Sequence, residues 1–259
     1  MAENAVIDLR GSKINIWRAG KGETVLFLHG LQGRNDHEPG LEELAKSFEV
    51  IAPDHPGFGR SESVDGVDDI KDLSLFYLDL LDALKLDRVH VVGQCIGGWL
   101  ALELAIYAGQ KFKSLSLVNS AGIRVKDVPR GDLFVCSEED MVRMLFAGNG
   151  GAEWMKSIRG AGELEDIYER NRAAAAKYSW SPRLCNPKLD RWLHRVNAPV
   201  HIVWGEQNRV LPPAYGEALK KLIPGASHAT IANCAHLAHI EQPQKFAQEI
   251  SQFIRRTGT

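Results

Sequence analysis

Hydrophobic and polar positions alternate at the start of the chain and then give way to short, continuous apolar runs. Residues 5–10 and 13–17 alternate on either side of Gly11-Ser12, which predicts an antiparallel hairpin. The later runs end at glycine, proline or polar residues, a pattern typical of strands covered on both faces of a parallel sheet. These predicted strands are Thr24–Leu28, Glu49–Ala52, Val89–Val92, Ser114–Val118, Val200–Trp204 and Ala229–Ala232.

Helical patterns lie between the predicted strands. Residues 69–86 carry apolar side chains at intervals of three and four, which is the period of an amphipathic helix. The predicted helices are Leu41–Lys46, Asp69–Leu86, Trp99–Ala108, Tyr215–Leu222 and Gln244–Ile254. Strands that alternate with helices predict an α/β fold in which helices flank a mostly parallel central sheet.

One interval, residues 122–196, contains helical patches and no convincing strand. The patches are Glu138–Phe146, Glu153–Ser157, Glu163–Tyr178 and Lys188–Arg195. Because parallel sheets bind ligands beyond the carboxyl ends of their strands, an insertion that leaves the sheet there predicts a helical cap over a binding site. We therefore divide the chain into a core of residues 1–121 and 197–259 and a cap of residues 122–196, with Gly148–Gly151 as the most flexible loop.

Composition excludes several classes of protein. The chain has 259 residues, of which 44% are hydrophobic and 25% charged, and its formal net charge is -2. These values are ordinary for a globular protein and give no electrostatic reason to expect a nucleic-acid partner. No apolar run approaches the roughly 18 residues of a membrane span, and residues 1–8 show no secretory signal. The cysteines form no Cys-x-x-Cys pair, so we expect reduced thiols in a cytoplasmic protein.

One cysteine differs from the others in its neighbours. Cys95 is the third residue of Gly-Gln-Cys-Ile-Gly-Gly (residues 93–98), which follows a predicted strand and opens a predicted helix. Glycines on both sides of one residue at such a turn predict a tight elbow that exposes the central side chain at the top of the sheet. The helix amino terminus favours a thiolate there, so Cys95 is the candidate nucleophile.

A nucleophile of this kind needs a base, and the base is expected in the loop after the last strand. His236 lies in that loop and is our candidate, whereas we assign His239 an orienting or structural role. The two histidines have no third ligand nearby in the sequence and no His-Glu-x-x-His pattern. We therefore expect no metal and no cofactor.

These motifs together resemble a known family. The matching pieces are His29-Gly30, residues 54–61, residues 93–97, residues 204–212 and His236 followed by Glu241-Gln-Pro. In content and order they resemble the α/β-hydrolase fold family with an inserted helical cap, in the general layout of its esterase and lactonase branch. The resemblance spans nearly the whole chain, and it is specific for the fold rather than for a substrate.

The resemblance also places the third member of a catalytic triad. The family usually has Asp at the position that is Asn208 here, and its nucleophile is usually Ser. An amide oxygen can still accept a hydrogen bond from an imidazole N–H, and cysteine needs a charged partner less than serine does, because a Cys–His pair can rest as thiolate and imidazolium. We interpret both departures as one change in nucleophile chemistry. Glu206 and Asn119 remain alternatives to Asn208.

The same resemblance implies an oxyanion hole formed by the backbone N–H groups of Leu31 and Ile96. His29, Gly30 and Gln94 border this loop and are further candidates for substrate binding. Trp154 and Trp180 lie in the predicted cap, where they either line an apolar pocket or anchor the cap helices to one another. Asp54 and its neighbours are expected to shape a turn.

The predicted activity is hydrolysis of an ester, thioester or lactone, a small carbonyl substrate, through an acyl-cysteine intermediate. Acyl transfer from the same intermediate is the nearest alternative. Hydrolases of carbon–carbon bonds share the layout but typically have Asn-Ser at the elbow and Trp after the histidine, whereas this chain has Gln94-Cys95 and Leu237. A ligand-binding protein that has lost turnover is the alternative outside catalysis.

Overall fold

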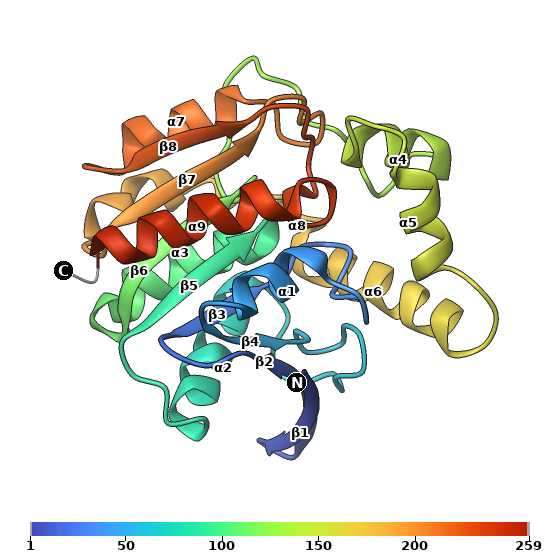
Figure 1. Ribbon diagram of the computed structural model, residues 1–259, viewed down its shortest axis with the longest axis horizontal. Helices are drawn as coiled ribbons and strands as arrows, with labels where there is room; N and C mark the ends of the chain where they lie inside the picture. Colours follow the sequence, from blue (N-terminus) through green and yellow to red (C-terminus); the bar gives the residue numbers. More distant parts are fainter. Residues whose placement is uncertain (1, 258–259) are drawn as a thin grey trace.

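A single sheet organises the protein. The computed structural model describes residues 2–257 and contains an 8-stranded sheet in the order β1-β2-β4-β3-β5-β6-β7-β8 (Figure 1). The strands β1 and β2 pair antiparallel, β2 pairs antiparallel with β4, and the other neighbours are parallel. Their bounds are β1 Glu3–Leu9, β2 Ser12–Ala19, β3 Thr24–Leu28, β4 Glu49–Pro53, β5 Val89–Gln94, β6 Phe112–Val118, β7 Val200–Gly205 and β8 Ser227–Ile231.

Helices cover both faces of the sheet because the central strands are apolar on both sides. In β3, Val25 and Phe27 join the cluster packed against α1 and α9, whereas Leu26 and Leu28 join the cluster packed against α2, α3 and α7. This alternation follows from the two-residue period of a strand. The helix bounds are α1 Pro39–Ala45, α2 Ile70–Ala83, α3 Ile96–Ala108, α7 Ala214–Leu222, α8 Ala238–Glu241 and α9 Pro243–Thr257, and η1 spans Gly109–Lys111.

The predicted α/β fold is confirmed, with differences in detail. The last strand begins two residues earlier than its apolar run, at Ser227, because backbone pairing with β7 extends it into polar positions. The short helix α8 has no sequence pattern of its own and was not predicted. Residues 188–195 form two 3₁₀ turns, η2 Leu189–Arg191 and η3 Leu193–Arg195, rather than one helix.

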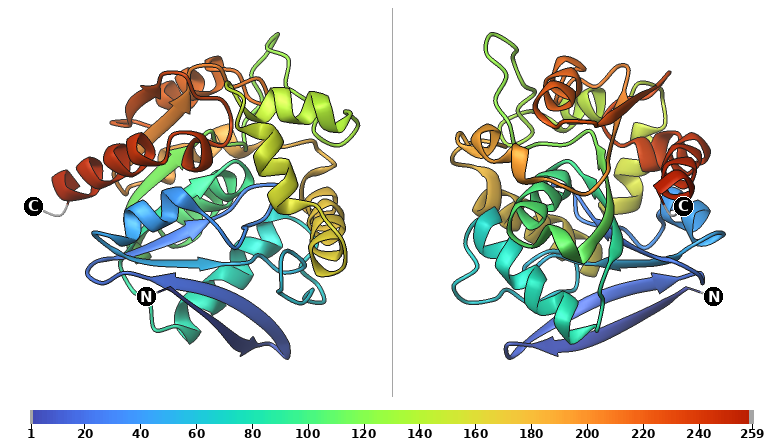
Figure 2. Two further views of the ribbon diagram at one scale, coloured as in Figure 1. Left: turned by 45° about the vertical axis from the view of Figure 1, so that its right-hand side comes forward. Right: turned by 90° about the vertical axis from the view of Figure 1, so that its left-hand side faces the viewer.

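A helical insertion follows β6 and returns to the sheet at β7. It contains α4 Glu138–Leu145, α5 Gly151–Ile158 and α6 Glu163–Ser179, which stand beside the sheet in Figures 1 and 2. None of the helices within residues 2–257 is long and apolar enough to cross a bilayer. The division of the chain at residues 122 and 196 stays a prediction.

Several hydrogen bonds attach the insertion to the core, including contacts from α6 and from the end of α4. On α6, the Tyr178 hydroxyl donates to the carbonyl of Pro56 (3.0 Å), and the Asn171 side chain bridges Gln32 and Gly59. At the end of α4, the carbonyl of Leu145 accepts the backbone N–H of the candidate base, His236. The cap therefore touches both the loop after β3 and the loop after β8.

A buried ion pair holds the turn after β4. The Asp54 carboxylate accepts hydrogen bonds from Arg34 Nε (3.2 Å), Asn15 Nδ2 (2.8 Å) and the Arg60 backbone N–H (3.1 Å). The side chains of Arg34 and Asp54 are each 2% exposed. The turn expected around Asp54 is therefore present, and it joins β2, β4 and the loop after β3.

We expect Asp54→Ala to lower the free energy of unfolding by about 3–5 kcal/mol, because it leaves the Arg34 guanidinium buried without a counter-charge. Asp36→Ala is the matched control: it removes an exposed partner of Arg60 and should cost about 1 kcal/mol or less. Urea unfolding of both variants measures the difference. If both variants lost the same free energy of unfolding, burial would not be the reason why the Arg34–Asp54 pair stabilises the fold.

Candidate functional site

Cys95 lies at a strained turn between β5 and α3. Its backbone has φ 51° and ψ -114°, a conformation that L-residues rarely adopt. The strain is held by hydrogen bonds from Cys95 N to the Val118 carbonyl and from the backbone N–H of Ala121 to the Cys95 carbonyl. The end of β6 and the residues directly after it thus hold the elbow in place, and the thiol lies at the carboxyl end of the sheet.

The elbow requires glycine at Gly97. A Cβ atom there would lie 2.0 Å from the carbonyl oxygen of Leu28, so any side chain would collide with β3. This close approach places the first turn of α3 directly against the loop after β3. The motif seen in the sequence therefore exists because two backbones pass each other at this point.

Two backbone N–H groups face the thiol of Cys95. They belong to Leu31 and Ile96, and both act to lower the pKa of the thiol. Burial acts more strongly in the opposite direction and raises the pKa of Cys95 to about 12. The N–H pair proposed from the sequence as an oxyanion hole therefore converges on the candidate nucleophile, in a site from which water is excluded.

The candidate base contacts Asn208. The Nδ1 atom of His236 lies 3.2 Å from Asn208 Oδ1, which also accepts the backbone N–H groups of Val210 (3.1 Å) and Leu211 (3.0 Å). Because Oδ1 faces three donors, the amide orientation is determined, and the proton of neutral His236 lies on Nδ1. Its Nε2 atom is therefore left with a lone pair that can accept a proton.

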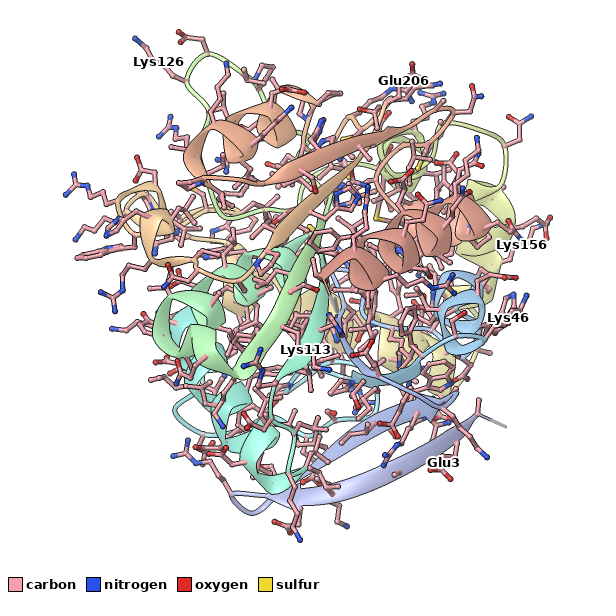
Figure 3. All side chains as sticks on the ribbon, turned by 60° about the vertical axis from the view of Figure 1, so that its left-hand side comes forward. Glu3, Lys46, Lys113, Lys126, Lys156 and Glu206 are labelled. Carbon is pink, nitrogen blue, oxygen red and sulfur yellow. The ribbon has the colours of Figure 1, made fainter. Side chains whose placement is uncertain are left out.

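The two alternatives to Asn208 have other partners. Asn119 donates from Nδ2 to the carbonyls of Ala235 and His236 and accepts the Gly205 N–H on Oδ1, so it holds the backbone of the histidine loop and not the ring. Glu206 is exposed at the surface (Figure 3) and accepts the N–H of Asn233. Among these three residues, Asn208 is the one that contacts the imidazole.

The protonation states of Cys95 and His236 differ from the thiolate and imidazolium that the sequence suggested. Burial lowers the pKa of His236 to about 3, with a smaller contribution from His239. Together with the raised pKa of Cys95, this makes both side chains neutral at pH 7. Within residues 2–257, the thiol and the imidazole form no hydrogen bond. Such contacts in unliganded enzymes often form only with bound substrate.

The side chains of Gln94 and Glu241 hold the histidine loop. Gln94 donates from Nε2 to the His236 carbonyl (3.3 Å), and its side chain fills the space where Gly30 lacks a Cβ. The Glu241 carboxylate accepts the N–H of Ala235 (2.7 Å) and also the N–H groups of Ala147 and Gly148 in the cap. Gln94 and Glu241 therefore act as structural links around the site, and the predicted flexible loop is hydrogen-bonded at Gly148.

A buried aromatic network supports the loop that carries Leu31. His29 Nδ1 bonds the Gly30 carbonyl (2.9 Å), and its Nε2 accepts the backbone N–H of His55 (2.9 Å). The His55 ring donates from Nε2 to the His29 carbonyl (3.0 Å) and accepts from the Tyr77 hydroxyl (2.5 Å). Every ring nitrogen of this network has a partner. His29 is therefore buried behind the loop that carries Leu31, and both of its ring nitrogens bond backbone groups.

A cavity of about 310 Å³ lies beside Leu31, between the core and the cap. Its walls are mostly apolar and include Phe134, Met141, Ala176 and Trp180. Trp180 is 46% exposed and forms part of the rim. Trp154 is buried and packs against Phe146 (ring centroids 5.4 Å apart), so it joins α5 to the end of α4 and does not line this cavity.

His239 lies apart from the candidate triad. Its Nε2 atom is 3.3 Å from a carboxylate oxygen of Glu38, and both side chains are buried. Among residues 2–257, no group of three or more His, Cys, Asp or Glu side chains is arranged to hold a metal ion. The contact with Glu38 links α8 to the start of α1.

Comparison with known families identifies the fold. Residues 25–249 match the model described as "Alpha/beta hydrolase family". The chain belongs to the alpha/beta hydrolase family. Two solved structures of this fold are a membrane phospholipase A (TM-score 0.83, 22% identity, 100% of this chain and 87% of that one) and an esterase from Thermogutta terrifontis (TM-score 0.78, 23% identity, 99% and 100%). At these identities they show the fold alone.

Curated relatives of this α/β hydrolase carry several activities. A dihydrolipoyllysine-residue acetyltransferase component of an acetoin cleaving system from Cupriavidus necator is 29% identical over 92% of this chain, which spans 66% of that protein. Lipase 3 of Moraxella sp. is 26% identical (90% of this chain, 77% of the relative). The 2-hydroxymuconate semialdehyde hydrolase of a Pseudomonas species is also 26% identical (94% and 91%).

The buried histidines predict loss of stability in acid. Burial lowers the pKa of His29 and of His236 to about 3 each. Between pH 6.5 and 3 the unfolded chain binds protons that the folded protein excludes. As the pH falls through this range, each histidine therefore lowers the free energy of unfolding by about 1.4 kcal/mol for every pH unit. Urea unfolding at pH 7.5 and 5.0 measures this slope.

His236→Gln should make the slope shallower, whereas His194→Gln, at an exposed position, should leave it unchanged. A stability that stays constant between pH 7.5 and 5.0 would contradict the burial of these rings.

Proposed function

We propose that the protein hydrolyses an ester, thioester or lactone through an acyl-cysteine intermediate. The observation that carries the proposal is the convergence of the Leu31 and Ile96 N–H groups on the thiol of Cys95. Donors placed in this way stabilise the negative oxygen that develops when a nucleophile adds to a carbonyl carbon. The relative named a lipase supports the same reaction class.

The reaction begins from a neutral pair. The Cys95 sulfur attacks the carbonyl carbon while its proton passes to His236 Nε2, and the carbonyl oxygen takes the negative charge between the two N–H groups. When the tetrahedral intermediate collapses, the leaving group takes that proton and the acyl group stays on sulfur. His236 then accepts a proton from water while the water oxygen attacks the thioester. When this second intermediate collapses, the acid is released and the Cys95 sulfur takes the proton back from His236.

Asn208 acts on the base and not on the substrate. Its Oδ1 atom holds the Nδ1–H of His236 and so directs Nε2 toward the proton that is transferred. An amide offers no negative charge to the imidazolium that forms during attack, and for a serine nucleophile this loss is severe. A thiol ionises more easily than a hydroxyl, so we propose that cysteine and asparagine function together here.

The relative named an acetyltransferase component favours acyl transfer as a second candidate. The same acyl-cysteine would then pass its acyl group to a thiol, amine or alcohol instead of water. The relative named a semialdehyde hydrolase supports carbon–carbon bond hydrolysis less, because Gln94-Cys95 and Leu237 depart from the motif expected for that reaction. Product analysis with and without an added thiol acceptor separates hydrolysis from transfer.

Cys95→Ala should lower the hydrolysis of p-nitrophenyl esters by about 10³-fold or more, because no nucleophile remains. Cys136→Ala is the matched control, since Cys136 is partly exposed and outside the site, and it should retain the activity of the unaltered protein. If Cys95→Ala hydrolysed the ester as fast as Cys136→Ala does, or if the unaltered protein hydrolysed no activated ester, the proposal would be wrong.

A double-mutant cycle tests the pairing of cysteine with asparagine. We expect Cys95→Ser alone to be about 10²-fold or more slower than the unaltered protein, because serine needs the missing carboxylate. Asn208→Asp should then raise the rate of the serine variant by a larger factor than the rate of the cysteine protein. If Asn208→Asp changed the rates of the serine variant and of the cysteine protein by the same factor, the effect of position 208 would not depend on the nucleophile.

A further inference from the structure

A second, larger hollow lies next to the cavity at Leu31. It has a volume of about 920 Å³ and is formed by the loop of residues 124–132 together with Arg183, Leu184 and Tyr215. This volume is in the range of sites for ligands of drug or nucleotide size. Neither the motifs nor the proposed chemistry uses it.

The charges around this hollow are unbalanced. Four cations line it, Arg124, Lys126, Arg130 and Arg183, against the carboxylates of Asp127 and Asp132. Arg183 pairs with Asp132. Within residues 2–257 the other three cations form no ion pair, and the Arg130 guanidinium donates to the Arg183 carbonyl. Lys126 stands out from the tip of the loop in Figure 3. Uncompensated cations around one concave surface attract an anion.

Arg183 joins the basic hollow to the apolar cavity. Its guanidinium lies 4.0 Å from the centroid of the Trp180 ring and 5.5 Å from that of Phe134, and both rings line the cavity beside Leu31. The chain also passes directly from Asp132 in one wall to Leu133 in the other. One ligand can therefore extend from the candidate oxyanion hole, past Arg183, into the basic hollow.

The basic hollow is also connected to the loop that orients the base. The N–H of Gly131 donates to the carbonyl of Val210 (2.9 Å), and the N–H of Val210 donates to Asn208 Oδ1 (3.1 Å). The wall of the hollow thus lies two hydrogen bonds from the side chain that holds His236. A ligand bound there would lie against the framework of the site.

We propose that the substrate is an acyl thioester whose thiol part carries phosphate groups, with the phosphates bound by Arg124, Lys126 and Arg130. Arginine and lysine bind phosphate through charge-assisted hydrogen bonds. The acyl group occupies the apolar cavity, and the thioester carbonyl lies between the N–H groups of Leu31 and Ile96. This inference rests on the proposed function and names the substrate class of the same site. The expelled thiol takes the proton from His236, as described above.

Two thioesters with the same acyl group test the proposal. One is the coenzyme A thioester, which carries phosphates, and the other is the N-acetylcysteamine thioester, which carries none. We expect kcat/KM to be at least about tenfold higher for the coenzyme A thioester, and the ratio to shrink as ionic strength rises. Equal kcat/KM values for the two thioesters would overturn the phosphate assignment while leaving the Cys95 chemistry intact.

A triple substitution locates the phosphate site. Replacing Arg124, Lys126 and Arg130 by glutamine should reduce the ratio of the two kcat/KM values by about tenfold. The matched control replaces Lys71, Lys85 and Arg88 by glutamine, which removes the same charge from exposed positions far from the hollow in the fold and should leave the ratio unchanged. Equal effects of the two triple variants would show that net charge, and not the hollow, determines the preference.

Binding distinguishes failure of this inference from failure of the proposed function. Calorimetry of coenzyme A with Cys95→Ala, with and without the triple substitution, needs no turnover. Binding that the triple substitution removes would support the phosphate site even if no ester were hydrolysed. Absence of coenzyme A binding would overturn the inference. Inorganic phosphate that binds as tightly as coenzyme A would show a small-anion site instead and would also overturn the thioester assignment.

Discussion

The strained backbone at Cys95 is the constraint on which the rest of the site depends. Its φ of 51° turns the chain from β5 directly into α3, so that the thiol and the Ile96 N–H point to the same side. The conformation persists because Val118 and Ala121 hold both backbone groups of Cys95 and because Gly97 allows α3 to touch β3. Local strain of this kind is a common way to fix a reactive group in position.

Burial then determines the chemistry that the elbow supports. Burial destabilises both the thiolate and the imidazolium, so the pKa of Cys95 rises and that of His236 falls. The two N–H groups cannot reverse this for the thiol at rest, yet they face the place where an oxyanion would form. In the proposed reaction, the charge is therefore generated during attack and not stored beforehand. Among residues 2–257, the buried Nδ2 atom of Asn208 has no hydrogen-bond partner. The surroundings of this side chain therefore hold an amide no better than they would hold a carboxylate.

Much of the fold was predictable because its signals are local. Apolar runs and helical periods each depend on neighbouring residues. The glycines around Cys95 indicate that two backbone segments pass close to each other, because only glycine leaves enough room there. The contact between Asn208 and His236 was expected only through family resemblance. The roles of Asn119, Tyr77 and Glu241 could not be predicted, because each pairs with a partner far away in the chain and leaves no periodic pattern.

The basic hollow could not be predicted from the sequence. Its cations are visible in the sequence, but so are many others. Only the folded chain shows that Arg124 and Arg130 share one concave surface with Arg183, and that Arg183 also borders the apolar cavity. The proposed phosphate site depends on which charges the fold leaves without partners, and composition does not report that.

The central claim is that Cys95 carries the acyl group with its carbonyl oxygen between two backbone donors. A crystal structure of the protein trapped with a slowly hydrolysed acyl thioester tests it most directly. The account predicts a thioester bond to the Cys95 sulfur, with the acyl oxygen about 2.7–3.1 Å from the nitrogens of Leu31 and Ile96. An acyl group on another residue, or an acyl oxygen directed away from both nitrogens, would contradict it.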